Sequence, residues 1–509
     1  MSRFLLAIVF ISTAIVIAGI NLGFDFSDEG LYVFLADPKQ ANGGGIINYD
    51  LFFKFLHKLF GLEFGIIGLR FIRLFSYFAG AWAIAVFWKN MNSEKSISFE
   101  MYLLAVIGLF AGYAFLPPSI SYNSISVVLA CFWLSSISKK EKQWTDHFIL
   151  GIILGLLFYA KITTCLILGC LTLGISVYKG EFTWKLIAGL VIPFILLELG
   201  IFIILTETGV SRIITGLDLM SSRKDYGYVL LFKYMAVGVF WLGIVFTPFW
   251  ISGFSLRKSK LLASGFGLLG LAVLVLVFIN TYITDEWNHG VLLVTVAGFG
   301  FVLGKNGFSN LFPSQRLSLV LLIGMPFFLF FGSNVYWLRL GIHYWVFWVF
   351  ALMLFFSKFP LKIQNGLKIG VGIVSLILVT NGIWISPFGQ EPLWNADQIW
   401  EYGSGKTILL SQKQVDLLYD LKEKTDQYSS DQVIAIYRIP GILYLLDKNS
   451  PKSPGYWSRS HLNSYFPEGI NPDLIIYSPS DSLPDGEWVT FKKQGYVIPN
   501  VGEIQVLWR

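Results

Sequence analysis

The chain has 509 residues, of which 55% are hydrophobic and 14% are charged, with a net charge of +6 and a mean hydropathy of +0.64. Soluble domains carry about 25% charged residues, so the composition excludes an ordinary soluble protein and favours a helical membrane protein, whose backbone groups pair within each helix. The modest net charge gives no indication of nucleic-acid binding and fits basic loops that orient a membrane protein.

The chain is expected to cross the membrane about thirteen times, because apolar runs of roughly 17–25 residues recur along it. The first run, residues 4–20, follows Arg3. It is long for a signal peptide, and Ile20-Asn21-Leu22 is a poor cleavage site, so we expect a membrane span and not a cleaved signal peptide. The other runs lie at about 65–87, 99–116, 119–137, 147–160, 162–178, 186–205, 229–252, 261–280, 291–304, 317–332, 343–357 and 367–386. Together they predict an all-α polytopic membrane domain over residues 1–386.

Charged residues in the loops assign the two sides of the membrane. With the N-terminus in the cytoplasm, lysine-rich loops such as 139–142 and 257–260 fall on the cytoplasmic side, as the positive-inside rule requires. The first outer loop, residues 21–64, then carries Asp28 and Glu29 next to each other. Two adjacent carboxylates at the mouth of a membrane span are costly to desolvate, so they indicate a function.

From about residue 387 the composition changes, because polar residues, Pro and Gly become frequent and no run is long enough to span a bilayer. An odd number of spans places this tail outside the cell. We expect a small extracytoplasmic α/β domain over residues 387–509. Its predicted elements are a helix at Gln412–Thr425 and strands at Val433–Tyr437, Leu474–Tyr477, Trp488–Phe491 and Ile504–Trp508.

Several motifs in the first third of the chain resemble those of the GT-C glycosyltransferases. They are Asp28-Glu29-Gly30-Leu31-Tyr32, the amphipathic stretch from Asn48 to Gly61, Leu69-Arg70-Phe71-Ile72-Arg73, and the glycine-rich run Gly151–Lys161. The closest resemblance is to protein O-mannosyltransferases and bacterial aminoarabinose transferases. Family members often have a Pro-Pro pair in the first loop, which this chain lacks there, so the subfamily and the substrate stay open.

The resemblance implies a membrane glycosyltransferase of cell-envelope glycan biosynthesis, placed in a bacterial inner membrane. Its donor would be a sugar linked to a polyprenyl phosphate, and its acceptor a glycan, a lipid or a protein on the extracytoplasmic side. The implied reaction is an in-line attack that inverts the anomeric carbon. No soluble cofactor is implied.

The first loop and the second span supply the leading candidate site residues. Asp28 is expected to be the general base, and Glu29 could orient it, bind a metal or face water; a solvated acidic loop is the plain alternative. Arg70 and Arg73 are spaced i, i+3 and share a helix face, so both could bind the lipid phosphate. Their plain alternative is snorkelling to lipid headgroups.

Three further basic residues are candidates for the same phosphate or for the donor sugar. Lys161 interrupts a long apolar tract, where a lysine is expensive unless it reaches a water-filled cavity or an outer rim. Arg339 and His343 are spaced i, i+4 in an aromatic outer turn, and would stack if that turn were helical. An aromatic belt with a snorkelled arginine is the alternative.

A divalent metal could take part. Asp285, Glu286 and His289 form a second acidic outer loop, whose carboxylates and imidazole could bind a cation together with the first-loop carboxylate. Arg212, Arg223 and Lys224 lie in another outer loop with Asp218 and Asp225 and could attract an anionic donor, but the mixed charges favour a plain solvated loop.

Two other classes of function remain open. One is an O-antigen polymerase or ligase-like protein of lipid-linked glycans, whose outer loops would be rich in arginine and would lack the early acidic pair. The other is a transporter or flippase, which would carry charges at mid-membrane depth and internal repeats. Glu198, inside an apolar run, keeps the transporter option open.

Overall fold

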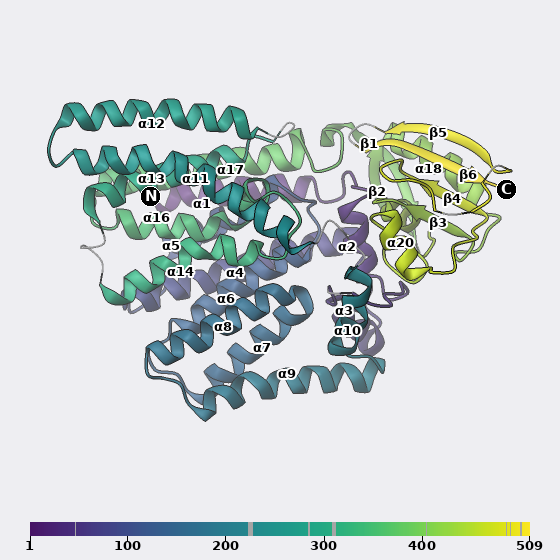
Figure 1. The fold of residues 1–509 in the computed structure, drawn as a ribbon, viewed down its shortest axis with the longest axis horizontal. Helices are drawn as coiled ribbons and strands as arrows, with labels where there is room; N and C mark the ends of the chain where they lie inside the picture. Colours follow the sequence, from purple (N-terminus) through teal and green to yellow (C-terminus); the bar gives the residue numbers. More distant parts are fainter. Residues whose placement is uncertain are drawn as a thin grey trace.

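The structure, a computed structural model, describes the whole chain except residues 46, 222–226, 283–285, 308–311, 404, 485, 489, 499 and 500. It has two parts: a large bundle of apolar helices, and a smaller sheet domain formed by the C-terminal residues (Figure 1). A thin layer of short helices lies between them.

The bundle holds helices that are apolar enough for a membrane. Among the described residues, six are also long enough to cross one: Gly65–Asn92, Trp184–Leu205, Val229–Ser255, Lys260–Thr281, Trp337–Phe356 and Leu361–Ile385. Shorter apolar helices are Ser2–Ala18, Phe99–Ala114, Tyr122–Ile137, Trp144–Ala160, Ile162–Tyr178, His289–Lys305 and Gln315–Phe330. Every apolar run predicted from the sequence falls on one of these helices.

The helices of the bundle are named here in chain order. They are α1 (Ser2–Ala18), α4 (Gly65–Asn92), α5 (Phe99–Phe110), η1 (Ala111–Ala114), α6 (Tyr122–Ile137), α7 (Trp144–Ala160), α8 (Ile162–Tyr178), α9 (Trp184–Leu205), α11 (Tyr228–Ser255), α12 (Lys260–Thr281), α13 (His289–Asn306), α14 (Pro313–Phe330), α15 (Trp337–Leu340), η3 (Gly341–Tyr344), α16 (Trp345–Phe356), α17 (Leu361–Thr380) and η4 (Asn381–Ile385).

Burial distinguishes the inner helices from the outer ones. In α16 almost every side chain is buried, so this helix lies in the centre of the bundle. In contrast, α9 and α12 expose large apolar side chains along their length, including Ile203 and Leu261. Apolar surface of this extent is stable in contact with lipid and not in water. The bundle therefore has the character of a membrane domain.

Three short helices form the layer between the bundle and the sheet domain (Figure 1). They are α2 (Asp28–Ala36), α3 (Asp50–Phe60) and α10 (Gly209–Ser221). The amphipathic stretch predicted in the first loop is α3. Arg212 of α10 forms an ion pair with the buried Asp50 at the start of α3, which links two segments far apart in the sequence.

The C-terminal domain contains two sheets. Strands β1 (Ala396–Tyr402) and β2 (Lys406–Ser411) form an antiparallel pair, and the larger sheet has the order β3-β4-β6-β5. In the larger sheet β3 and β4 are parallel, and the other pairs are antiparallel. Its elements are α18 (Gln412–Thr425), β3 (Val433–Ile436), α19 (Pro440–Leu445), α20 (Arg459–Tyr465), β4 (Leu474–Tyr477), β5 (Lys492–Ile498) and β6 (Gly502–Trp508).

Most elements predicted in this domain are confirmed, with one correction. The helix at Gln412–Thr425 and the strands β3, β4 and β6 lie where they were expected. The strand predicted at Trp488–Phe491 is wrong for its described residues, 488, 490 and 491, because the pairing strand β5 begins at Lys492; Val489 lies outside the described residues. Trp488 and Phe491 instead make an edge-to-face contact with ring centroids 5.1 Å apart. Aromatic residues near a strand were mistaken for the strand itself.

The sheet domain and the first loop share one hydrophobic core. Phe24, Phe26 and Phe34 are buried together with apolar side chains of the sheet domain. Gly30 of α2 and Gly441 of α19 meet backbone to backbone, and the Gly441 amide donates to the Phe26 carbonyl at 2.8 Å. The start of the first loop is therefore held between the bundle and the sheet domain.

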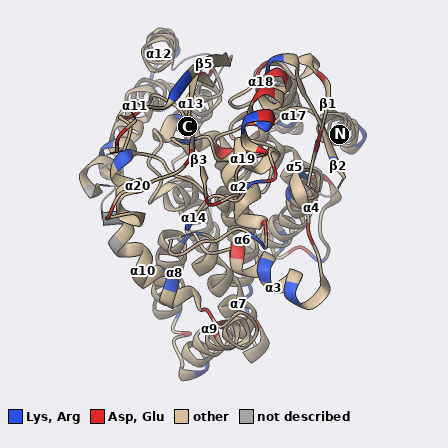
Figure 2. Ribbon diagram, turned by 90° about the vertical axis from the view of Figure 1, so that its right-hand side faces the viewer, with Lys and Arg blue, Asp and Glu red and all other residues tan. Residues whose placement is uncertain are grey.

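Charged residues are also distributed differently over the two parts of the protein. Seen from the sheet-domain end, charged residues lie on α18 and α3, while the helices behind them are mostly uncharged (Figure 2).

Candidate active site

The two adjacent carboxylates of the first loop point to different surroundings. Helix α2 starts at Asp28, and Asp25 caps it: its carboxylate accepts from the Ser27 amide at 3.1 Å and the Glu29 amide at 3.0 Å. In return, Glu29 Oε2 accepts from the Asp25 amide at 3.3 Å. Because successive residues of a helix face different directions, Glu29 turns into the protein and Asp28 turns towards a cavity.

Glu29 forms a buried ion pair with Arg70 of α4. The Arg70 Nε and Nη2 atoms donate to the two Glu29 carboxylate oxygens, each at 2.8 Å, and both residues are almost fully buried. The remaining Arg70 donors bind the carbonyl oxygens of Ile20, Leu22 and Gly23, which lie just after α1. Every N–H of this guanidinium is thus used within the protein.

Arg73 is engaged in the same way. Its guanidinium donates to the Pro117 carbonyl and to the Gly112 carbonyl at 2.9 Å, and its Nε donates to the Tyr77 hydroxyl at 3.1 Å. It also lies 4.3 Å from the centre of the Tyr113 ring. Arg70 and Arg73 share a helix face as predicted, but both bind carbonyl groups of connections between helices and do not line the cavity beside Asp28.

Asp28 lies on the wall of a cavity of about 140 Å³ that the bundle and the sheet domain form together. The bundle side contributes Tyr122 and Asn123 at the start of α6 and residues around Leu340. Most of the other residues lining it come from α2, the glycine patch of the first loop and the sheet domain, and include Tyr32, Gly44, Gly45, Arg438, Pro454, Trp457, His461 and Tyr465. The walls thus combine apolar and aromatic side chains with few charges, as is typical of a ligand-binding pocket.

Two opposing effects set the protonation of Asp28. Burial of its carboxyl group raises the pKa above the ordinary aspartate value, and the positive charges of Arg438 and, less strongly, Arg339 lower it. Burial is the larger effect, so the pKa of Asp28 is raised overall. A carboxylate whose pKa is raised towards neutrality is a better proton acceptor than an ordinary one.

Arg438 is a site residue that the sequence did not indicate. It follows strand β3 with φ = 61°, a left-handed conformation that is uncommon for residues other than glycine. Its side chain is exposed, and its guanidinium has no hydrogen-bond or ion-pair partner in the part of the chain that the structure describes. An arginine held in a strained conformation without a partner is typical of a binding site.

Arg438 also connects two spaces. Besides the Asp28 cavity, it lines an open groove of about 620 Å³ on the sheet domain, together with Trp457, Arg459, Asn463 and Asp481. Trp457 is likewise shared by both. The outer groove therefore leads to the cavity in which Asp28 lies.

Two of the three other predicted cationic residues, Lys161 and Arg339, lie near this cavity. Lys161, between α7 and α8, donates to the Leu329 carbonyl and to Ser333 Oγ, and its ammonium lies 5.8 Å from the centre of the Tyr122 ring. Since Tyr122 lines the cavity, Lys161 lies behind its wall. The positive charge of Arg339 acts on Asp28 and lowers its pKa. The Arg339 guanidinium itself forms a bidentate ion pair with Glu286, in which each hydrogen bond is 2.6 Å long.

The stacking predicted for Arg339 and His343 does not occur. Arg339 lies in α15 and His343 in the tighter helix η3, so the α-helical spacing is interrupted between them. His343 Nδ1 lies 3.1 Å from the Gly112 carbonyl, which Arg73 also contacts. Its Nε2 is buried with no hydrogen-bond partner among the described residues.

In the candidate metal site, the Glu286 carboxylate forms an ion pair. Glu286 pairs with Arg339, and His289 stacks on Phe278 with ring centroids 4.9 Å apart. Asp285, Arg223 and Lys224 lie outside the described residues. Within the described residues, no group of three or more His, Cys, Asp and Glu side chains could hold a metal ion.

Glu198, the charge inside an apolar run, caps a helix. Its carboxylate accepts from the amides of Gly209 at 3.2 Å and Val210 at 3.3 Å, where α10 begins, and from the Tyr159 hydroxyl. A carboxylate at a helix N-terminus is stabilised by the helix dipole. This position explains Glu198 without a role in proton transport.

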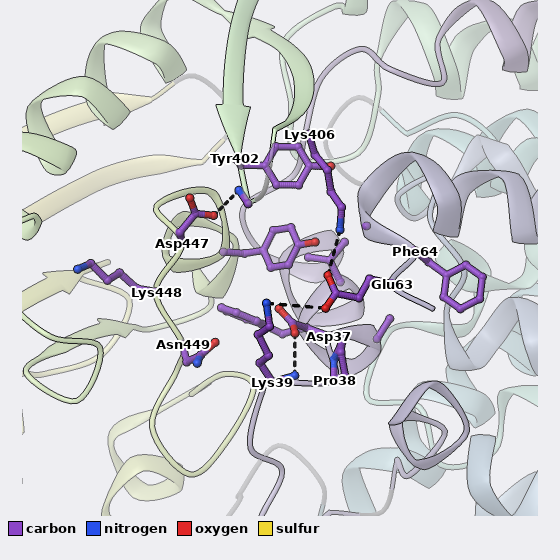
Figure 3. Close-up of a pocket in the computed structure, with 16 residues that line it drawn as sticks. Asp37, Pro38, Lys39, Glu63, Phe64, Tyr402, Lys406, Asp447, Lys448 and Asn449 are labelled. Carbon is purple, nitrogen blue, oxygen red and sulfur yellow. Dashed lines mark hydrogen bonds and ion pairs between the residues drawn. The ribbon is translucent and has the colours of Figure 1, made fainter. Parts of the chain in front are cut away.

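A second cavity, of about 350 Å³, lies on the other face of α2 (Figure 3). Glu63 lies there between Lys39 and Lys406, each 3.7 Å from its carboxylate. The Asp37 carboxylate accepts from the Lys39 amide at 2.8 Å, and burial raises its pKa. Opposite charges compensate one another in this cavity and join the first loop to β2.

No protein-family model matches the chain, and no curated protein matches it in sequence. A functional assignment therefore depends on the motifs and on the geometry around Asp28.

Proposed function

We propose that the protein is a membrane glycosyltransferase of the GT-C type, which moves a sugar from a polyprenyl phosphate to an acceptor outside the cell. The observation that carries this proposal is the position of Asp28. It lies in a cavity between an apolar bundle, from which a lipid-linked donor can arrive, and a polar domain, from which an acceptor can arrive.

The chemistry follows from this arrangement. The acceptor hydroxyl attacks the anomeric carbon, and Asp28 takes the hydroxyl proton as the new carbon–oxygen bond forms. The bond from the anomeric carbon to the phosphate oxygen breaks, and the polyprenyl phosphate leaves with the electron pair. Because attack and departure occur on opposite sides, the anomeric configuration inverts. A positioned general base contributes about 10²–10⁴-fold to the rate.

Positive charge must stabilise the leaving phosphate, and several basic residues around the cavity would contribute it. Arg438, which has no described partner, is the best-placed cation, and Arg339 adds to the field that Asp28 experiences. Lys161 supports the wall at Tyr122. We assign Arg70 and Glu29 a positioning role, since their mutual ion pair holds the loop that presents Asp28.

The same proposal includes the membrane topology. About thirteen helices cross a bacterial inner membrane, with the N-terminus in the cytoplasm and the sheet domain outside. Basic loops on one side support this orientation.

The test is a turnover assay with purified protein in lipid nanodiscs. A panel of polyprenyl-phosphate sugars is supplied with candidate acceptors, and release of free polyprenyl phosphate is measured. The proposal expects at least one donor to be turned over, with inversion of the product. Consumption of lipid pyrophosphate oligosaccharides alone would indicate a polymerase or ligase. Movement of a solute across the bilayer without any turnover would indicate a transporter.

A further inference from the structure

A third cavity lies at the end of the bundle away from the sheet domain. It has a volume of about 490 Å³ and lies between the α6–α7 and α8–α9 connections, where Lys140, Lys142, His147, Glu181 and Lys185 line it. The helix ends that form the α8–α9 connection lie on the far side from the sheet domain (Figure 1). This cavity is therefore separate from the Asp28 site.

The contacts of Lys140 place the cavity along the bundle. Its ammonium donates to Ser93 Oγ at 2.8 Å, and Ser93 immediately follows the last residue of α4. The first residue of the same helix, Gly65, lines the cavity of Figure 3 beside the sheet domain. Since α4 runs through the bundle from one end to the other, Lys140 lies at the opposite membrane surface.

A buried histidine at this cavity lacks a partner. His147, on the first turn of α7, is only 8% exposed, and its Nδ1 has no hydrogen-bond partner among the described residues. Gly189 on α9 packs closely against it, because a Cβ added there would lie 2.5 Å from the His147 Cβ. A buried polar atom without a partner destabilises the folded protein. An oxygen-bearing ligand in the cavity would satisfy it.

The lysines make the cavity positive. Lys142 pairs with Glu181 at 2.6 Å, which leaves the charges of Lys140 and Lys185 without a carboxylate among the residues that line the cavity. Lys185 is exposed and makes no hydrogen bond or ion pair in the described part of the chain. Two lysines and a buried imidazole converge on one space, which is a suitable site for a phosphate anion.

The aromatic side chains near the cavity favour a lipid phosphate over a soluble one as its ligand. Trp144, which lines the cavity, is 41% exposed, and three more exposed aromatic residues lie in or next to the α8–α9 connection: Tyr178 78%, Phe182 52% and Trp184 79%. Exposed Trp and Tyr next to lysines are typical of the level at which lipid headgroups lie. A soluble phosphate would gain nothing from these rings, whereas a lipid could place its chains among them.

We propose that the cavity bounded by Lys140, Lys185 and His147 binds the phosphate headgroup of an anionic membrane lipid, such as phosphatidylglycerol or cardiolipin. The two lysines neutralise the phosphate, and His147 Nδ1 bonds one of its oxygens or a headgroup hydroxyl. Basic pockets between membrane helices bind such headgroups. This inference does not depend on the glycosyltransferase proposal.

The test measures anionic lipid retained by the purified full-length protein in phosphatidylcholine nanodiscs titrated with cardiolipin, using native mass spectrometry. Lys185→Ala should weaken retention about fivefold, because a lysine near an anionic surface is worth about 1 kcal/mol. His147→Phe keeps a ring of similar size without the nitrogen and should also weaken it. The matched control is Lys362→Ala: Lys362 is the second residue of α17, as Lys185 is of α9, and is likewise exposed.

The outcomes separate the alternatives. Loss of retention in Lys185→Ala but not in Lys362→Ala supports the proposal. Equal retention in both variants, or equal loss in both, overturns it, because either result shows that this cavity is not a specific site. Thermal stabilisation by millimolar inorganic phosphate, equal to that by cardiolipin and lost in Lys185→Ala, also overturns it and assigns the cavity to a soluble anion.

Discussion

The buried pair of Glu29 and Arg70 gives the sharpest prediction about stability. Replacing Glu29 with alanine leaves the Arg70 guanidinium, 1% exposed, without a counter-charge. Breaking a buried pair by removing one partner costs about 3–5 kcal/mol. Glu29 also accepts from Ser119 Oγ at 2.5 Å and from the Asp25 amide at 3.3 Å, so the upper part of that range is expected.

Arg70→Met should be at least as costly. It leaves the Glu29 carboxylate buried and also removes the donors of the Ile20, Leu22 and Gly23 carbonyls. Each unsatisfied buried acceptor adds about 1–3 kcal/mol. Thermal unfolding in detergent, followed by size-exclusion chromatography, measures both variants against the wild-type protein.

One result would refute this reasoning. If Glu29→Ala unfolded at the wild-type temperature but lost all turnover, Glu29 would be catalytic and not structural. The conservative variant Glu29→Gln keeps the shape of the side chain without its charge. It should lie between the wild-type protein and Glu29→Ala in unfolding temperature.

Two further predictions concern the cavity and the contact that closes it. Arg438→Ala removes the cation that lowers the pKa of Asp28 most, so the pKa of Asp28 should rise further. The acid limb of the pH–turnover profile should therefore move to higher pH. An acid limb at the wild-type position would contradict this coupling. Gly30→Ala places a Cβ 2.3 Å from the Gly441 amide nitrogen, so limited proteolysis should release the sheet domain more readily, at a cost of about 1–3 kcal/mol. Gly200→Ala, whose Cβ would meet nothing within 4 Å, is the control and should leave protease resistance unchanged.

The sequence was sufficient for the helices and for most of the sheet domain. Apolar runs locate helices because each must satisfy its own backbone in lipid, and α18 begins and ends at the predicted residues. The strands β1 and β2 were not predicted. They pair with each other around the turn at Gly403, and β2 also bonds to the first loop through the Leu409 amide and the Asn21 carbonyl. The β1–β2 pairing is local, but the bond that ties β2 to the first loop is long-range and leaves no local signal in the sequence.

The site was predicted in part. The acidic pair was recognised, but its division into a buried Glu29 and a cavity-lining Asp28 depends on Arg70, which lies 41 residues further along the chain. Arg438 lies 410 positions from Asp28 in the sequence and could not be connected to it by spacing. Its only local sign was an arginine directly after a buried strand and shortly before Pro440.

The central claim is that Asp28 accepts the proton of the acceptor, and one comparison tests it most directly. Asp28→Asn and Asp37→Asn change the same group at the two ends of one helix, α2, next to different cavities. With a donor that the wild-type protein turns over, Asp28→Asn should lose about 10²–10⁴-fold in rate at an unchanged unfolding temperature, and Asp37→Asn should retain its rate. Full turnover by Asp28→Asn, or an equal loss in both variants, would contradict the account.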